Sequence, residues 1–197
     1  MQLGLFPLPN FVLLPGMVVP LYVFEPRYRD LLKRVQKHKE PFGIVRIKTE
    51  VNSYHPEQRI SRVGTLAHLS EVEQHPDGSA SIVITGGERF EIESFDPVSH
   101  TYLTAKVHPK PLLPSNEESV RLLASLAWGG FLRAVAPELV ELMHQNAPHD
   151  PLALASFMIS NLKLPSLEAQ HMLEANTLEE RLEMLLNHVP VAERSFN

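Results

Sequence analysis

The chain has 197 residues, of which 44% are hydrophobic and 21% are charged, and its formal net charge is −5. This composition is typical of a soluble globular protein, and the length allows one core or two small packed units. The negative charge gives no general reason to expect nucleic acid or an anionic membrane as the partner. Because the sequence contains no cysteine, it excludes disulfides, thiolate nucleophiles, cysteine-ligated zinc and iron–sulfur clusters.

The opening segment, residues 1–24, carries no charged side chain and contains prolines at positions 7, 9, 15 and 20. Each proline removes a backbone donor and clashes with a preceding helical turn, which argues against a membrane-spanning helix or an exported leader. An uncharged, extended segment escapes water only inside a folded β-structure. The segment therefore predicts a bent core strand and no membrane as partner. Because neither a leader nor a disulfide is expected, the predicted location is cytoplasmic.

A helix is predicted next, because Pro26 suits the first helical position and apolar residues recur at helical spacing before Pro41. The apolar face consists of Tyr28, Leu31, Leu32 and Val35. The opposite face is basic and consists of Arg27, Arg29, Lys33, Arg34, Lys37 and Lys39. We interpret the basic face as solvated; a binding face for acidic peptides or phosphates is the alternative.

Stretches of β-type pattern predict further strands at residues 42–48, 63–72, 81–84, 89–93 and 102–107. The polar residues 50–59 predict a loop. Turns are predicted at His75–Gly78 and at Gly86–Gly87. Six or so short strands with one inserted helix favour a small, mainly antiparallel β-barrel.

The pattern changes after prolines at positions 109, 111 and 114, where the apolar spacing lengthens from two to about three and a half residues. The sequence therefore predicts an α+β protein with two units, a barrel at residues 1–112 and a helical bundle at residues 113–197. Helix starts are expected at capping residues and prolines, namely Ser115, Pro137, Asp150, Ser166 and Thr177.

Several motifs in the barrel half occur together: Phe6–Asn10, Leu13–Gly16, Pro20–Leu21, Phe24–Tyr28, Arg62–Ala67 and Ile84–Ile92. In combination they resemble the amino-terminal domain of Lon proteases, also called the LON substrate-binding domain. The resemblance continues into the helical half and so covers nearly the whole chain. It implies a PUA-like barrel, and it identifies the chain as a stand-alone domain of this type.

No catalytic motif is found. The sequence has no Gly-x-x-x-x-Gly-Lys-Ser/Thr loop for nucleotide phosphates, no Gly-x-Ser-x-Gly elbow and no His-Glu-x-x-His zinc motif. His144 and His149 lie on either side of Pro148, so a shared helix face for a metal is not expected. The ATPase and Ser–Lys peptidase modules of Lon proteases have no counterpart here. We therefore predict a protein that is not an enzyme, with no catalytic residue, cofactor or metal.

The resemblance implies a non-catalytic protein that binds extended, unfolded or damaged polypeptides, or an adaptor that delivers them to a full-length protease. It is expected to be a monomer or a weak homodimer. Aromatic residues and one neighbouring arginine are the candidate peptide-binding residues, namely Tyr22, Phe24, Arg27, Tyr28, Trp128 and Phe131. For each aromatic residue, packing within the core is the alternative.

A second function is kept open. PUA domains bind RNA, and the basic helix face at residues 27–39 gives this alternative its only local support. The net charge of −5 and the absence of a known RNA-binding motif make nucleic acid the less favoured partner.

Overall fold

The structure is a computed structural model that describes residues 1–190. The chain divides into two compact units, the first formed by Met1–Pro111 and the second beginning at Leu112. The first unit contains a six-stranded sheet and the second is helical, which confirms the predicted α+β class.

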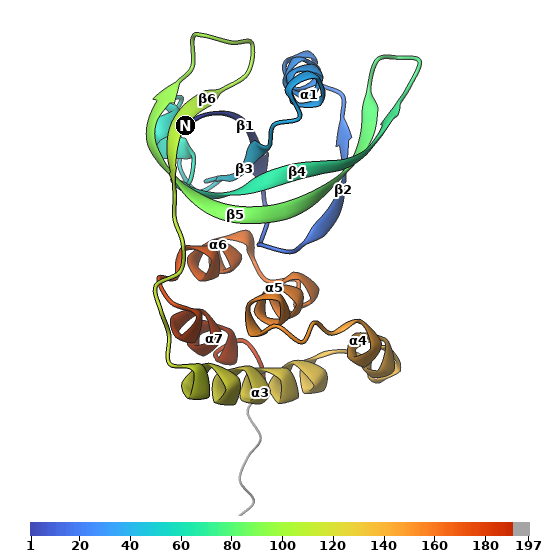
Figure 1. Cartoon of the computed structure of the whole chain (residues 1–197), viewed down its shortest axis with the longest axis vertical. Helices are drawn as coiled ribbons and strands as arrows, with labels where there is room; N and C mark the ends of the chain where they lie inside the picture. The colour runs from blue at the N-terminus through green and yellow to red at the C-terminus, as the bar shows by residue number, and fades with distance from the viewer. Residues whose placement is uncertain (191–197) are drawn as a thin grey trace, which may run out of the picture. The chain divides into compact units, whose positions relative to one another are not determined.

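The first unit is a β-barrel (Figure 1). Its elements are β1 (Gln2–Pro9), β2 (Val18–Val23), α1 (Pro26–His38), β3 (Phe42–Ile47), α2 (Pro56–Arg59), β4 (Val63–Gln74), β5 (Ala80–Asp96) and β6 (Thr104–Pro109). The sheet order is β2-β5-β4-β3-β1-β6, and β5 also pairs with β6, which closes the ring. Only β1 and β3 run parallel among the strand pairs of this sheet within residues 1–190.

The opening segment forms β1, as the sequence predicts. The prolines of β1 occupy positions where no N–H is needed for a hydrogen bond to a neighbouring strand. The amide of Leu5 donates to the carbonyl of Leu103 at 2.8 Å, and β6 pairs with β1 only at Gln2–Gly4. Alternate residues of a strand direct their backbone groups to the same side, so Pro7 faces the side that β6 has already left.

The predicted turn at Gly86–Gly87 is wrong, because β5 continues through both glycines. Gly86 instead permits a close approach of the loop between β1 and β2. Its amide donates to Met17 at 2.8 Å, and its carbonyl accepts from Gly16 at 2.8 Å. A Cβ atom at position 86 would overlap the carbonyl oxygen of Leu14. The glycine therefore lets the opening segment close onto the barrel.

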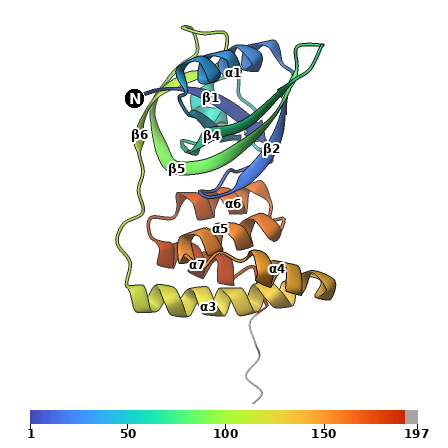
Figure 2. The same ribbon diagram turned by 45° about the vertical axis from the view of Figure 1, so that its right-hand side comes forward.

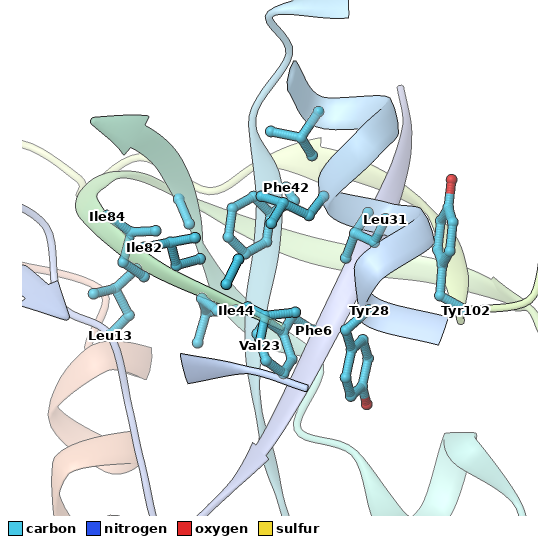
Figure 3. Packing of buried hydrophobic residues seen from close by; sticks show 14 residues of the cluster. Phe6, Leu13, Val23, Tyr28, Leu31, Phe42, Ile44, Ile82, Ile84 and Tyr102 are labelled. Atoms are coloured by element: carbon cyan, nitrogen blue, oxygen red, sulfur yellow. The ribbon is translucent and has the colours of Figure 1, made fainter. Parts of the chain in front are cut away.

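Helix α1 supplies one side of the barrel core. Its buried residues are Tyr28, Leu31, Leu32 and Val35, as predicted. Figure 3 shows Tyr28 and Leu31 among buried residues of the strands, including Phe6, Phe42, Ile44, Ile82 and Ile84. The rings of Phe6 and Tyr28 lie 4.2 Å apart. In Figures 1 and 2 the helix lies on the concave side of the curved β4 and β5.

The second unit consists of short helices. They are α3 (Glu117–Ala134), the 3-10 helix η1 (Pro137–Leu139), α4 (Val140–Asn146), α5 (Pro151–Asn161), α6 (Ser166–Glu174) and α7 (Leu178–Leu186). Asp150 and Thr177 cap their helices as predicted, accepting from backbone amides at 2.9 and 3.0 Å. The cap of α3 is Asn116 rather than Ser115, because the Asn116 side chain reaches two amides at 3.0 Å. Ser166 is the first residue of α6, not its cap.

The core of the helical unit includes Phe131, Met158, Leu182 and Leu185. It also contains Arg181, whose guanidinium donates to the carbonyl of Met172 at 2.9 Å near the end of α6. A cation at this end complements the carbonyl oxygens that the helix leaves without internal partners.

Acid is expected to weaken the barrel through its surface carboxylates. A hydrogen bond from Lys110 at 2.8 Å holds the pKa of Glu91 below its ordinary value of 4.5. Because the pKa of Glu91 is lower in the folded state than in the unfolded state, its ionisation stabilises the folded state above pH 4.5. This stabilisation is lost as the pH falls through the lowered pKa. We expect Glu91→Gln to reduce the free energy of unfolding by about 0.5 kcal/mol at pH 7, because the pair is partly exposed.

The comparison of wild type with Glu91→Gln in urea at pH 7 and pH 3.5 tests this linkage. The difference between the two proteins is expected to shrink at the lower pH. A difference that stays constant would show that the carboxylate makes no pH-dependent contribution. Glu88→Gln is the matched control, since Glu88 forms no ion pair with any residue that the structure describes.

Candidate functional site

Strand β2 is the end strand of the barrel sheet and has one open edge. Within the described part of the chain, β5 is the only strand that pairs with it. Its outward face continues into the residue after the strand and carries exposed apolar side chains. Val18, Tyr22 and Phe24 have 65%, 54% and 58% of their surface exposed. Single exposed apolar residues are ordinary, whereas apolar residues gathered on one face mark a candidate interaction surface.

The aromatic side chains of this face are held in place. The Tyr22 hydroxyl lies 2.6 Å from the Ser79 hydroxyl, and the Tyr22 ring stacks on Phe24 with centroids 6.1 Å apart. The ring centroid of His75 lies 5.9 Å from that of Tyr22. Because these rings are already ordered, a partner that contacts them would restrict little further side-chain freedom in this protein.

A groove of about 400 Å³ lies beside Tyr22, and we call it the β2 groove. Its lining residues are Pro20, Leu21, Tyr22, Glu71, Val72, Glu73, Ser81, Ile82 and Val83. Glu71 and Glu73 are the charged residues in this lining, so the groove has negative potential. The β4 part of this site was not predicted from the sequence; the alternation of Glu71 and Glu73 in a predicted strand was the available signal.

Arg27 and Tyr28 lie together at a second hollow of the barrel unit, with a volume of about 360 Å³, which we call the α1 cavity. Arg27 bonds to Glu25 at 2.8 Å and lies over the Tyr28 ring, 4.6 Å from its centroid. Tyr28 is only 6% exposed, so most of its ring belongs to the core. Tyr54 and Arg59 also line this cavity; they were not predicted as site residues because they fall in the predicted loop.

Trp128 and Phe131 are neighbours on α3. Their rings stack with centroids 5.3 Å apart, and Trp128 also contacts His144 and Phe157 at 5.5 and 6.4 Å. Phe131 is completely buried, so for this residue the packing alternative is the observed one. Trp128 is half-buried. We therefore do not assign Phe131 to a binding surface.

The basic face of α1 is largely engaged in contacts within the barrel unit. Lys33 pairs with Asp30 at 3.3 Å and Arg34 pairs with Glu40 at 2.6 Å. Arg29 donates to the backbone carbonyl of Phe24 at 2.8 Å. Because these cations already have partners, the face offers less charge to phosphates than the sequence suggests.

Residues 1–190 contain no cluster of three or more His, Asp or Glu side chains that could hold a metal ion. The same residues contain no helix that is long and apolar enough to cross a membrane.

Comparison with solved structures gives the class to which this fold belongs. A Lon N-terminal domain protein from Xanthomonas campestris superposes with a TM-score of 0.68 and 25% identity, covering 96% of this chain and 99% of that one. The N-terminal domain of the Mycobacterium avium complex Lon protease superposes with a TM-score of 0.72 and 20% identity, covering 95% of this chain and 97% of that one. The fold is therefore that of a Lon N-terminal domain.

Sequence comparison gives the family. The family model of the ATP-dependent protease La (LON) substrate-binding domain matches residues 2–190, so the chain belongs to this family. The predicted resemblance is confirmed. The Lon protease of Chloroherpeton thalassium is 26% identical over 194 residues, which is 94% of this chain and 22% of that protein. The chain thus spans less than a quarter of the length of this curated relative.

Proposed function

We propose that this protein is a non-catalytic interaction protein that binds extended segments of unfolded polypeptides along the open edge of β2, with client side chains reaching into the neighbouring β2 groove. The family supports a role like that of a Lon amino-terminal domain. The observation that carries the proposal is the open edge of β2 beside the ordered, exposed rings of Tyr22 and Phe24.

An open strand edge offers main-chain groups to an added strand. Met17 accepts from Gly86 of β5, so the alternate residues Val18, Pro20 and Tyr22 direct their backbone groups to the open side. Pro20 lacks an N–H, which leaves donors at Val18 and Tyr22 only. The interrupted edge suits a short client segment, and it disfavours continuous pairing between two copies of this chain.

The charge of the groove favours one kind of client segment. Glu71 and Glu73 are exposed beside the apolar lining, and no cation is among the lining residues. Segments that combine apolar side chains with lysine or arginine therefore fit better than acidic ones. A single segment binds weakly, with a dissociation constant of about 10–100 µM, because ordering a flexible chain offsets part of the contact free energy.

Two fluorescent peptides of one apolar sequence, one with three lysines and one with three glutamates at the same positions, test the proposal by anisotropy. We expect the lysine peptide to bind at least fivefold more tightly, and Glu71→Lys with Glu73→Lys to reverse the preference. Glu57→Lys with Glu88→Lys is the matched control, because neither residue lines the groove. If neither peptide binds at about 100 µM, a range that corresponds to roughly 5 kcal/mol, the proposal is contradicted.

A further inference from the structure

The α1 cavity has a chemistry that differs from that of the β2 groove. Apolar walls come from residues of several elements, including Pro7, Ile47, Ile60 and Leu103. The charged lining residues are both cationic, Arg27 and Arg59, and no carboxylate is among the lining residues. A cavity that is apolar with a positive rim complements a ligand that is apolar with one negative group.

Tyr28 adds a hydroxyl group to the lining of the cavity. Tyr28 is 6% exposed, and its hydroxyl has no hydrogen-bond partner among residues 1–190. In Figure 3 the hydroxyl points away from the core cluster. Burial raises the pKa of Tyr28, opposed by the charge of Arg27, so the hydroxyl keeps its proton at neutral pH and can donate it to an acceptor. The ring is buried but the hydroxyl oxygen is not one of the buried atoms without a partner, so the hydroxyl reaches the cavity, where a bound anion can accept its hydrogen bond.

Arg27 and Arg59 both lie in helices, so their backbone positions are defined. Arg27 lies in the first turn of α1, a turn that itself contains no acidic residue. Its guanidinium pairs with Glu25, which does not line the cavity. Arg59 ends α2, and its carbonyl accepts from Lys48 at 2.7 Å. The Arg59 side chain makes no ion pair with the residues that the structure describes.

We propose that the α1 cavity binds the carboxyl-terminal residue of a polypeptide that ends in an aromatic or branched apolar side chain. The α-carboxylate accepts hydrogen bonds from Arg59, Arg27 and the Tyr28 hydroxyl, and the apolar side chain lies against the walls. The volume of about 360 Å³ is at the small end of ligand sites, which suits one or two terminal residues. This inference rests on the proposed function in that the ligand is a polypeptide.

Paired peptides test the inference. One sequence with no acidic side chain and a terminal phenylalanine is prepared as the free acid and as the amide, and both are titrated into the whole chain. We expect the acid to bind about tenfold more tightly, as charge-assisted hydrogen bonds require. Arg59→Gln should abolish most of that ratio, and Tyr28→Phe should reduce it about threefold while the ring keeps its packing. Arg121→Gln, an exposed arginine of α3, should leave the ratio unchanged.

Each outcome has one meaning. Equal affinities of acid and amide for the wild type overturn the inference, and so does a ratio that Arg59→Gln leaves intact. Binding of 3-phenylpropionate as tightly as the acid peptide would assign the cavity to a small carboxylate and overturn the chain-end assignment. If the lysine peptide binds while acid and amide are equal, the proposed function stands without this inference. If only the acid peptide binds, the assignment of the α1 cavity is supported and the proposed binding at the β2 groove is contradicted. A two-dimensional amide NMR spectrum confirms that each variant is folded.

Discussion

Replacing Gly86 by alanine is expected to lower the free energy of unfolding of the barrel by about 1–3 kcal/mol, the usual cost of overpacking. The added Cβ meets the backbone carbonyl of Leu14, which cannot rotate away as a side chain can. The two hydrogen bonds between Gly86 and the loop would have to lengthen as the loop moves. The opening segment then packs less closely on β5.

Gly87→Ala is the matched control for this substitution. Its Cβ would meet the His68 ring at 2.5 Å, and a side chain can move to another rotamer. We expect a smaller loss of stability than at position 86. The lone tryptophan, Trp128, lies in the helical unit, so amide hydrogen exchange of β5 peptides should be measured instead of fluorescence. If both variants exchange at the same rate, close approach at Gly86 does not hold the barrel closed.

Replacing both Tyr22 and Phe24 by serine is expected to weaken the binding of an unfolded, casein-like polypeptide at least tenfold. The two rings contribute the exposed aromatic area beside the open edge, and truncation of the few hot-spot residues of an interface costs about 2 kcal/mol or more. The barrel should remain folded, because both residues are more than half exposed. Binding can be followed by fluorescence anisotropy of the labelled polypeptide.

A second double variant separates this effect from a general loss of apolar surface. Leu122 and Leu126 of α3 are 61% and 52% exposed, and their replacement by serine removes a comparable exposed apolar surface. We expect this variant to bind like the wild type. Equal weakening by the two double variants would mean that clients attach to apolar surface without preference for β2.

The sequence predicts the barrel well because its local signals agree with the fold. Pro26 begins α1, and the spacing of Tyr28, Leu31, Leu32 and Val35 places that helix against the strands. The prediction fails at Gly86, since the same residue type serves a turn and a close approach equally. Only the tertiary contact with Leu14 distinguishes them. Asn116 was missed for a similar reason, because Ser115 and Asn116 are adjacent residues that both cap helices.

The candidate site was only partly predictable. An aromatic residue near a strand end suggests both packing and binding, and the sequence does not distinguish the buried Tyr28 from the exposed Tyr22. The β2 groove depends on the pairing of β2 with β5 and of β5 with β4, which brings Tyr22 near Glu73 across the sheet. Such neighbours are far apart in the sequence. The resemblance to Lon domains identified the family, but the acidic lining emerged from strand register.

Amide hydrogen exchange of the whole chain, with and without a saturating unfolded polypeptide, tests most directly whether β2 receives the client. We expect slower exchange at the outward-facing amides of Val18 and Tyr22, with little change in α3. The same experiment with the Tyr22→Ser and Phe24→Ser variant should show no protection. Binding that leaves the exchange of β2 unchanged would contradict the account.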